Sequence, residues 1–446
     1  MKILLVAYYF PPDSSSGSFR PLFFANYLAK MGDEITVLTA RQSDYLAEQT
    51  VDDTLLDRID SRISIQRTGV FRPREWILAR KEWLKVKRKN PSKLNSTPSA
   101  TKSGVKGAGF FRRTKDFVTF LLATPDPQIG WLPLCVLRGL LYIRKTKPDV
   151  ILATGGPWTG LLCGCVLRWF TGVPLVVDFR DPWVAAPGRN RRGPIIAMID
   201  AYMERRAVNC ATLLIANTNE LRENFLQRYP RLSAQQAITI TNGFEDYLPS
   251  TREPETQIVT LTHAGDIYAS RNVQPILEAT KNAIERGLID GEAFKLKFVG
   301  GFEPTNAGTS DLLASPALLK AVQLVPRVGF EESLRLMTSS DVLVVFQPGF
   351  PLQIPRKLYD YISARRPVLC ISEPGSATWS MVENWSLGVC SINEAAALEH
   401  AIVQLYRDAK AGQLQPLPDT RCNIFKNEYL TQQLRTEIAR ALKRVK

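Results

Sequence analysis

Mainly apolar runs alternate with amphipathic stretches along most of the chain. Residues 2–8, 35–39, 149–154 and 174–178 are runs of the kind that forms strands buried on both faces of a sheet. Between them, 19–31 and 194–209 place apolar residues at helical spacing. Strands that alternate with helices in this way predict a parallel sheet and the α/β class.

The alternation starts again in the second half, with predicted strands at 258–263, 295–299, 321–325 and 341–346. A chain of 446 residues exceeds the roughly 250 at which one core stops growing. We therefore predict two domains, 1–245 and 258–425, each a doubly wound parallel sheet. Residues 246–257 form the expected linker, and 426–446 form a terminal helix.

Segment 72–115 interrupts this pattern. It holds 14 Lys and Arg against 2 acids, interleaved with aromatic residues such as Trp76 and Phe110, so the net charge of +14 is largely local. Basic residues flanked by aromatics bind anionic lipid at about 1 kcal/mol per charge. We therefore expect this segment to be an insertion that binds an anionic membrane surface. The alternative is that it is a solvated loop without a partner. No nucleic-acid module accompanies it, so we expect no nucleic-acid partner.

Several classes of protein are excluded by what the sequence lacks. Its 7 Cys include no Cys-x-x-Cys, which argues against a disulfide framework or a zinc site. The N-terminal apolar run stops at Pro11-Pro12 and is too short for a signal peptide. No run reaches the roughly 18 uncharged apolar residues of a spanning helix. We expect a cytoplasmic protein that needs no metal or other cofactor.

Candidate binding residues follow the predicted strands. Gly17 and Arg20 lie in and after the small-residue loop that follows the first strand, and Gly155-Gly156 follow the strand at 149–154. In open α/β sheets, ligands gather outside the carboxyl ends of strands. The first loop lacks G-x-G-x-x-G, so a dehydrogenase fingerprint is not supported. Simple turn geometry is the alternative reading of Gly17.

A second cluster, Asp178-Phe179-Arg180-Asp181-Pro182-Trp183, follows the strand at 174–178. Two carboxylates around an arginine can orient or activate an acceptor hydroxyl. The alternative is an Asp–Arg pair that only fixes a loop.

In the second half, the segment 353–361 follows the buried run at 341–346. Pro355 suits a first helical turn, and Lys357 and Asp360 then share one helix face. The helix start and Lys357 favour a phosphate, and Asp360 can accept hydrogen bonds from ribose hydroxyls. A surface helix with an ion pair is the alternative.

Pro-Arg-Lys-Leu-Tyr-Asp-Tyr-Ile, followed by Arg-Arg-Pro-Val-Leu, resembles the donor-binding segment of GT-B glycosyltransferases. It is similar in particular to the family 4 group that builds bacterial surface polysaccharides. Asp-Phe-Arg-Asp-Pro-Trp is similar to a motif of one branch of these enzymes, where other members place a His-Asp pair. The resemblance covers essentially all of the chain except 72–115.

The resemblance implies a role for each site residue. It implies that Gly265, Arg271, Arg327, Lys357 and Asp360 bind the donor, with Asp266 where an Arg is common.

On the acceptor side, it implies catalytic roles for Asp178, Arg180 and Asp181 and a loop that faces acceptor and phosphates. That loop contains Gly17, Arg20, Gly155 and Gly156. The two domains would face each other across a cleft, and the terminal helix would pack back toward the first.

The chain departs from the family's Glu-x7-Glu pair, because Leu352 takes the first position and Asp360 the second. This leaves the donor sugar open. The resemblance implies transfer of a sugar from a nucleotide-diphosphate sugar to a hydroxyl of a saccharide or lipid-linked acceptor, with retained configuration. It also implies a location on the inner face of the cell membrane. A GT-B-fold sugar-nucleotide epimerase and a non-catalytic membrane-associated binding protein are the rival readings.

Overall fold

In the computed structural model, the described residues are 1–46, 49–71, 123–245, 258–267, 271–303 and 307–445. They form two compact units, one of Met1–Leu214 with Ile438–Lys446 and one of Ile215–Glu437. The predicted insertion at 72–115 and the linker at 246–257 lie outside the described residues. The limits proposed for the two domains therefore stay predictions.

The first sheet has seven strands. Its order is β3 (Ser64–Thr68), β2 (Glu34–Ala40), β1 (Lys2–Val6), β4 (Val150–Gly155), β5 (Leu175–Phe179), β6 (Leu213–Ala216) and β7 (Ala237–Thr239). The first strand, β1, pairs in parallel with β2 and with β4. All residues of β4 and β5 are buried, which explains why their sequences are almost continuously apolar.

The second sheet has six strands and the same winding. Its order is β10 (Val322–Val325), β9 (Phe294–Val299), β8 (Val259–Ala264), β11 (Val342–Phe346), β12 (Val368–Ile371) and β13 (Gly388–Ser391). Every pair of neighbouring strands in this sheet is parallel. In both sheets the strand order reverses beside the first strand, next to β4 and β11, and this switch point is where α/β sheets bind ligands.

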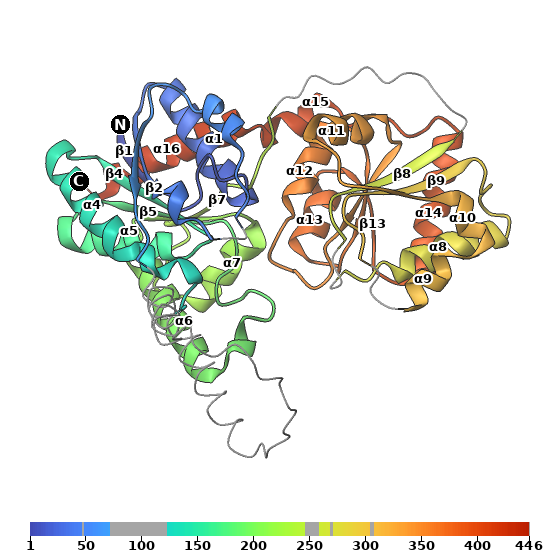
Figure 1. The fold of residues 1–446 in the computed structure, drawn as a ribbon, viewed down its shortest axis with the longest axis horizontal. Coiled ribbons are helices and arrows are strands. Elements are labelled where there is room, and N and C mark those ends of the chain that lie inside the picture. Colours follow the sequence, from blue (N-terminus) through green and yellow to red (C-terminus); the bar gives the residue numbers. More distant parts are fainter. Residues whose placement is uncertain (47–48, 72–122, 246–257, 268–270, 304–306, 446) are drawn as a thin grey trace, which may run out of the picture. The chain divides into compact units, whose positions relative to one another are not determined.

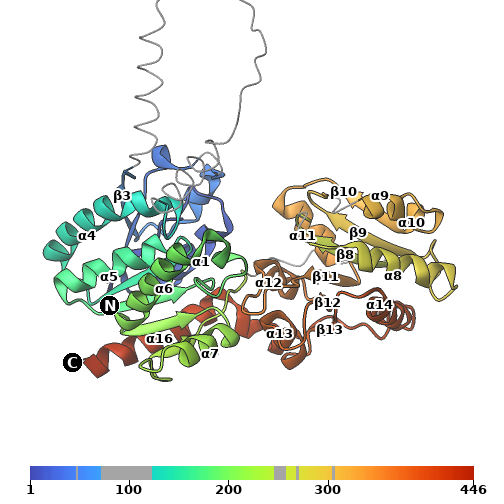
Figure 2. The ribbon, with the colours of Figure 1, turned by 90° about the horizontal axis from the view of Figure 1, so that it is seen from below.

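Helices cover the sheets (Figures 1 and 2). Those between the strands of the first sheet are α1 (Ser16–Lys30), α4 (Leu132–Thr146), α5 (Thr159–Thr171), α6 (Pro194–Asn209) and α7 (Asn219–Arg228). Those that follow are α8 (Gln274–Glu285), α9 (Ala307–Leu313), α10 (Pro316–Ala321), α11 (Phe330–Ser339), α12 (Arg356–Ser363), α13 (Ala377–Asn384), α14 (Ala395–Lys410), α15 (Asp419–Cys422) and α16 (Asn427–Val445). In the described part of the chain, short 3-10 helices lie at Gln42–Asp44, Asp53–Arg58, Pro127–Trp131, Arg189–Arg192 and Asn423–Phe425. None of the helices in the described ranges is long and apolar enough to cross a bilayer.

The two parallel sheets confirm the predicted α/β class and double winding. One detail differs at the start of α12, because Pro355 is the extended N-cap residue and the helix begins at Arg356. The sequence pattern did not predict the strands β3, β13 and β12 or the helix α14, among others. The first two are strands whose residues are only partly buried, so their sequences lack a continuous apolar run.

Candidate functional site

The turn after β8 brings the predicted donor residues of the second unit together. Gly265 has a φ of +126°, a conformation that side-chain-bearing residues rarely adopt. A Cβ at this position would lie 2.6 Å from Nζ of Lys357, which stands in the first turn of α12. Glycine is therefore required both for the turn and for the approach of the ammonium group to the end of the strand.

Lys357 is held there by His263, a buried residue of β8. His263 Nδ1 lies 2.8 Å from the carbonyl oxygen of Val344, which can only accept, so Nδ1 carries the proton. Nε2 is then an acceptor, and Lys357 Nζ donates to it over 3.0 Å. Burial, together with the nearby Lys357, holds the pKa of His263 well below its usual value. Burial, and secondly the charge of Arg271, lowers the pKa of Lys357 to about 7.

Asp360 lies one turn further along α12. Its carboxylate forms no hydrogen bond or ion pair with the residues that the structure describes. Burial raises the pKa of Asp360, and the positive charges of Arg356 and Lys357 offset only part of this effect. The neighbouring Tyr361 fastens the helix, because its hydroxyl accepts from the Ala264 N–H (2.9 Å) and donates to the Val344 carbonyl (3.1 Å). Asp360 is thus an oriented carboxylate that can accept hydrogen bonds from a ligand.

Two arginines complete this cluster by contacts with Asp266. The Asp266 carboxylate accepts the Gly301 N–H over 2.7 Å and forms an ion pair with Arg327. Its carbonyl oxygen accepts from Arg271 Nη1 over 3.2 Å. Asp266 therefore contacts two cations, of which Arg271 lies near Lys357, although its own charge is opposite to that of the arginine expected here from the family resemblance. Three cations that follow the carboxyl ends of β8, β10 and β11 suit a multiply charged anion.

In the first unit, the start of α1 and two loops meet around Arg180; Gly17 lies in the first turn of α1 and not in the loop where the sequence placed it. A Cβ at Gly17 would lie 2.7 Å from Arg180 Nη1, and one at Gly156 would lie 3.0 Å from Nη2. Gly156 also has a φ of +84°. Arg180 is mostly buried and pairs with the more exposed Asp181, with Nη2 and Oδ2 3.1 Å apart. The structure therefore brings Gly17, Gly156, Arg180 and Asp181 together at the carboxyl ends of β1, β4 and β5.

Asp178, near the end of β5, is enclosed by hydrogen-bond partners from the protein. Its side chain is fully buried, and both of its oxygens are hydrogen-bonded by Arg20, with the shortest distance 2.8 Å between Nη2 and Oδ1. Thr154 Oγ1 donates to Oδ2 over 2.9 Å. In this conformation Asp178 and Arg20 bind each other and hold the end of β5 against α1, and the roles predicted for them stay predictions. Gly155 is likewise a packing position, since a Cβ there would lie 2.9 Å from Leu161 Cδ1.

The tryptophan that ends the Asp-Phe-Arg-Asp-Pro-Trp motif is also structural. Trp183 is fully buried, stacks on Trp158 with ring centroids 5.7 Å apart, and donates to Asp200 Oδ1 over 3.2 Å. The guanidinium of Arg189 lies over the Trp158 ring and donates to the Asp200 carboxylate. These contacts fix the loop that carries Arg180 and Asp181.

Sequence reasoning missed His263 as a member of the donor cluster. The available signal was a histidine in a buried strand, two residues before the glycine that ends it. Such a residue has a buried polar group that must find a partner, and Lys357 is that partner.

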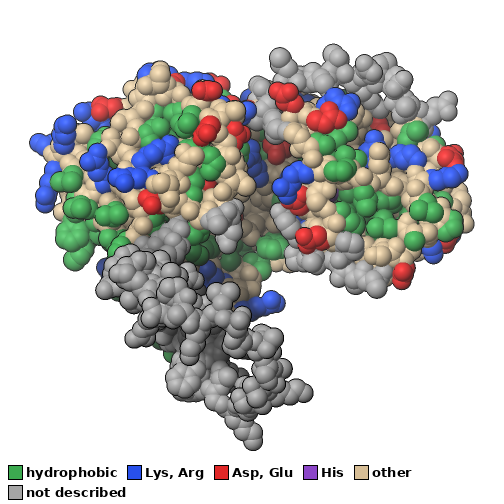
Figure 3. Space-filling model, viewed as in Figure 1, with side chains coloured by type: hydrophobic (Ala, Val, Ile, Leu, Met, Phe, Trp, Pro, Cys, Tyr) green, Lys and Arg blue, Asp and Glu red, His purple; other side chains and the backbone are tan. Residues whose placement is uncertain are grey.

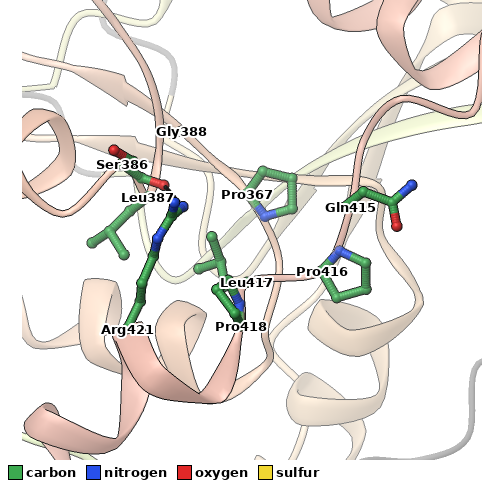
Figure 4. A pocket seen from close by; sticks show the side chains of 9 residues that line it. All are labelled: Pro367, Ser386, Leu387, Gly388, Gln415, Pro416, Leu417, Pro418 and Arg421. Atoms are coloured by element: carbon green, nitrogen blue, oxygen red, sulfur yellow. Dashed lines mark hydrogen bonds between the residues drawn. The ribbon is translucent and has the colours of Figure 1, made fainter.

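The described residues contain no candidate metal site, and the cavity in Figure 4 shares no residue with the clusters around Lys357 and Arg180. Across the described ranges, no three His, Cys, Asp or Glu side chains are grouped as a metal ion would need. The cavity has a volume of about 380 Å³ and is lined by Pro367, Leu387, Gly388 and Arg421 among others (Figure 4). Pro367, Leu387 and Gly388 precede or begin β12 and β13, and Arg421 belongs to α15. The cavity therefore lies at the amino ends of these strands, opposite to the donor cluster.

Comparison with known proteins gives the family context. The family model described as "Glycosyl transferase 4-like domain" matches residues 106–243. None of the curated proteins matches the chain in sequence.

Solved structures match over the full length. Sucrose-phosphate synthase from Thermosynechococcus elongatus has a TM-score of 0.63 at 17% identity and covers 100% of both chains. A glycosyltransferase from Rickettsia africae ESF-5 has a TM-score of 0.60 at 12% identity, covering 99% of this chain and 98% of that one. The lipopolysaccharide outer core galactosyltransferase WaaB has a TM-score of 0.54 at 12% identity, covering 98% and 99%. The chain has the GT-B fold and is a glycosyltransferase with a glycosyl transferase 4-like domain.

Proposed function

We propose that the protein transfers a sugar from a nucleotide-diphosphate sugar to a hydroxyl of a saccharide acceptor that is linked to a lipid. The observation that carries this proposal is the ammonium of Lys357, fixed between His263 and Gly265 at the switch point of the second sheet. Arg271 lies beside it, so a diphosphate placed there meets two cations and the start of α12.

In the reaction, the bond between the sugar's anomeric carbon and the diphosphate oxygen breaks, and the acceptor oxygen bonds to that carbon. Negative charge develops on the leaving diphosphate, and Lys357 and Arg271 stabilise it, which lowers the barrier. The acceptor's hydroxyl proton leaves with the departing phosphate or with a carboxylate near the acceptor. Asp360 accepts hydrogen bonds from the ribose hydroxyls, and Arg327 lies beside the base.

On the acceptor side, we assign binding to Arg180 and Asp181, with Gly17 and Gly156 leaving room for the guanidinium. Arg20 and Asp178 position this loop without contacting the acceptor. The resemblance to transferases of surface polysaccharide assembly supports a lipid-linked acceptor, a retained anomeric configuration and a location on the inner face of the cell membrane.

A binding experiment tests the donor site. Calorimetric titration with UDP, GDP, ADP, dTDP and CMP is expected to show one preferred nucleoside diphosphate. At 100 times its Kd, this ligand raises the free energy of unfolding by about 2.7 kcal/mol. Lys357→Ala is expected to abolish binding, whereas Arg407→Ala, which removes an exposed cation of α14, is expected to leave it unchanged. Unaltered binding by Lys357→Ala would refute the proposed donor site.

A further inference from the structure

The outer layer formed by α4, α5 and α6 exposes large apolar side chains on all three helices. In the first unit α4 packs against α5, and α5 against α6 (Figures 1 and 2). Two of these helices repeat the same spacing: Leu134, Leu137 and Leu141 on α4, and Ile195, Met198 and Tyr202 on α6. Residues at i, i+3 and i+7 share one helix face, so each helix presents an apolar stripe to solvent.

At the end of α5, Trp169 and Phe170 add two exposed rings, and Trp169 is 78% exposed. Eight of the sixteen large apolar side chains exposed in the described part of the chain thus lie on these three helices. Apolar side chains gather over α4 and α5 at the lower left of Figure 3, next to Lys and Arg side chains. An apolar surface of this extent marks an interaction site.

The charge on the same layer has a single sign. Its acidic residues are Asp200 and Glu204 on α6, and both are buried, the first bonded to Trp183 and Arg189 and the second to the Val184 N–H. Neither α4 nor α5 contains an acidic residue. Exposed cations, by contrast, occur on α4 and α6: Arg144, Lys145 and Arg205.

We propose that this layer is a docking surface for an anionic lipid bilayer, on which α4, α5 and α6 lie flat. Apolar side chains enter the boundary between headgroups and acyl chains, while the neighbouring cations contact anionic headgroups. A second copy of the chain fits this face less well, since two such faces would place cations of the same sign opposite each other. The surface is made only of described residues and includes none from the predicted insertion at 72–115.

Vesicle co-sedimentation tests this surface, and it needs neither donor nor acceptor, so its outcome is independent of the proposed reaction. The full chain is expected to bind vesicles of phosphatidylcholine with phosphatidylglycerol more tightly than vesicles of phosphatidylcholine alone. The triple variant Leu137→Gln, Trp169→Gln, Met198→Gln is expected to lower the affinity by about tenfold or more. Leu319→Gln removes a comparably exposed leucine from α10 in the other unit and is expected to have no effect.

The charge contribution is tested separately. Arg144→Glu, Lys145→Glu and Arg205→Glu are each expected to lower affinity for the anionic vesicles at least about fivefold. The control Arg407→Glu on α14 is expected to keep wild-type affinity. Each variant must unfold at the wild-type temperature, and none alters the segment 72–115.

Three results would overturn the proposal. The first is wild-type affinity in the apolar triple variant and in the charge variants. The second is loss of binding only when basic residues of 72–115 are replaced. The third is self-association in solution that the apolar triple variant abolishes while vesicle binding persists.

Discussion

The pair formed by Arg20 and Asp178 is predicted to contribute strongly to the stability of the first unit. Its side chains are 5% and 0% exposed. Arg20 Nε lies 3.0 Å from Oδ2 and Nη2 lies 2.8 Å from Oδ1, so the two groups meet fork to fork. Replacing Arg20 by Ala removes the cation and leaves a carboxylate enclosed by protein.

The magnitude follows from burial. Breaking a buried pair by removing one partner costs about 3–5 kcal/mol, because the remaining charge is neither hydrated nor compensated. In a domain of 150–250 residues, each kcal/mol lowers the unfolding temperature by about 2–4 °C. Arg20→Ala is therefore expected to lower the unfolding temperature of this unit by about 6–20 °C. Arg20→Met combined with Asp178→Leu should recover part of this loss, since no buried charge remains.

Differential scanning calorimetry measures this effect, and the chain offers a matched control. Arg62 and Asp60 form a pair of the same fork geometry, with Nη2 and Oδ2 2.6 Å apart, but the Arg62 side chain is 55% exposed. Exposed pairs contribute little because solvent screens them, so Arg62→Ala should shift the transition far less than Arg20→Ala does. If Arg20→Ala shifts it no more than Arg62→Ala does, the supporting role assigned to Asp178 is wrong.

Three further predictions concern the donor cluster and the cysteines. Because the pKa of Lys357 is about 7 and only the protonated amine attracts phosphate, nucleoside diphosphate affinity should fall by up to about tenfold per pH unit from pH 7 to 9. Titrations across this range should show no such fall in Lys357→Arg, whose side chain stays charged, and a flat wild-type profile would count against the assignment. Gly265→Ala should weaken diphosphate binding in a titration, since its Cβ would meet the ammonium of Lys357. The control Gly287→Ala, at a position with a φ of +68° and nothing within 4 Å of the added Cβ, should reduce stability but leave binding unchanged. Equal affinities of the two variants would refute this prediction. The sulfur atoms of Cys165 and Cys210 lie 2.6 Å apart, so oxidised glutathione should convert the two thiols to a disulfide while it is itself reduced to two thiols. Alkylation followed by mass spectrometry measures this. If both cysteines are still alkylated after the treatment, the prediction is wrong.

The hydrophobic pattern was sufficient to predict most of the central strands. β1, β4, β5, β8 and β11 are buried on both faces, so their sequences are almost continuously apolar and their limits fall within one or two residues of those predicted. At the edges of the sheets this signal weakens. In β3, only Thr68 is buried, and a partly solvated strand is not distinguished from a loop by its pattern alone.

The candidate site was predictable in position but less so in role. Ligand-facing residues follow the carboxyl ends of strands, and this rule alone grouped Gly17, Gly156 and Arg180 correctly on one edge. The rule does not say which carboxylate points outward. Asp178, the last but one residue of β5, points into the protein toward Arg20, while Asp181 lies beyond the strand and stays partly exposed.

The contact of His263 with Lys357 depends on tertiary structure that no local pattern encodes. The two residues are 94 positions apart, and they meet because β8 and the start of α12 share one end of the second sheet. Without this contact, the segment 353–361 is equally well described as a surface helix with an ion pair.

The central claim is that this enzyme transfers sugar from a nucleotide donor to an acceptor, and acceptor-dependent donor consumption tests it most directly. Purified protein is incubated with sugar nucleotides of the base identified by titration, with and without a lipid-linked saccharide fraction. The account predicts release of nucleoside diphosphate only when acceptor is present, loss of that release in Lys357→Ala, and retention in Arg407→Ala. Conversion of the donor to an isomeric sugar nucleotide without acceptor, or equal turnover in Lys357→Ala, would contradict it.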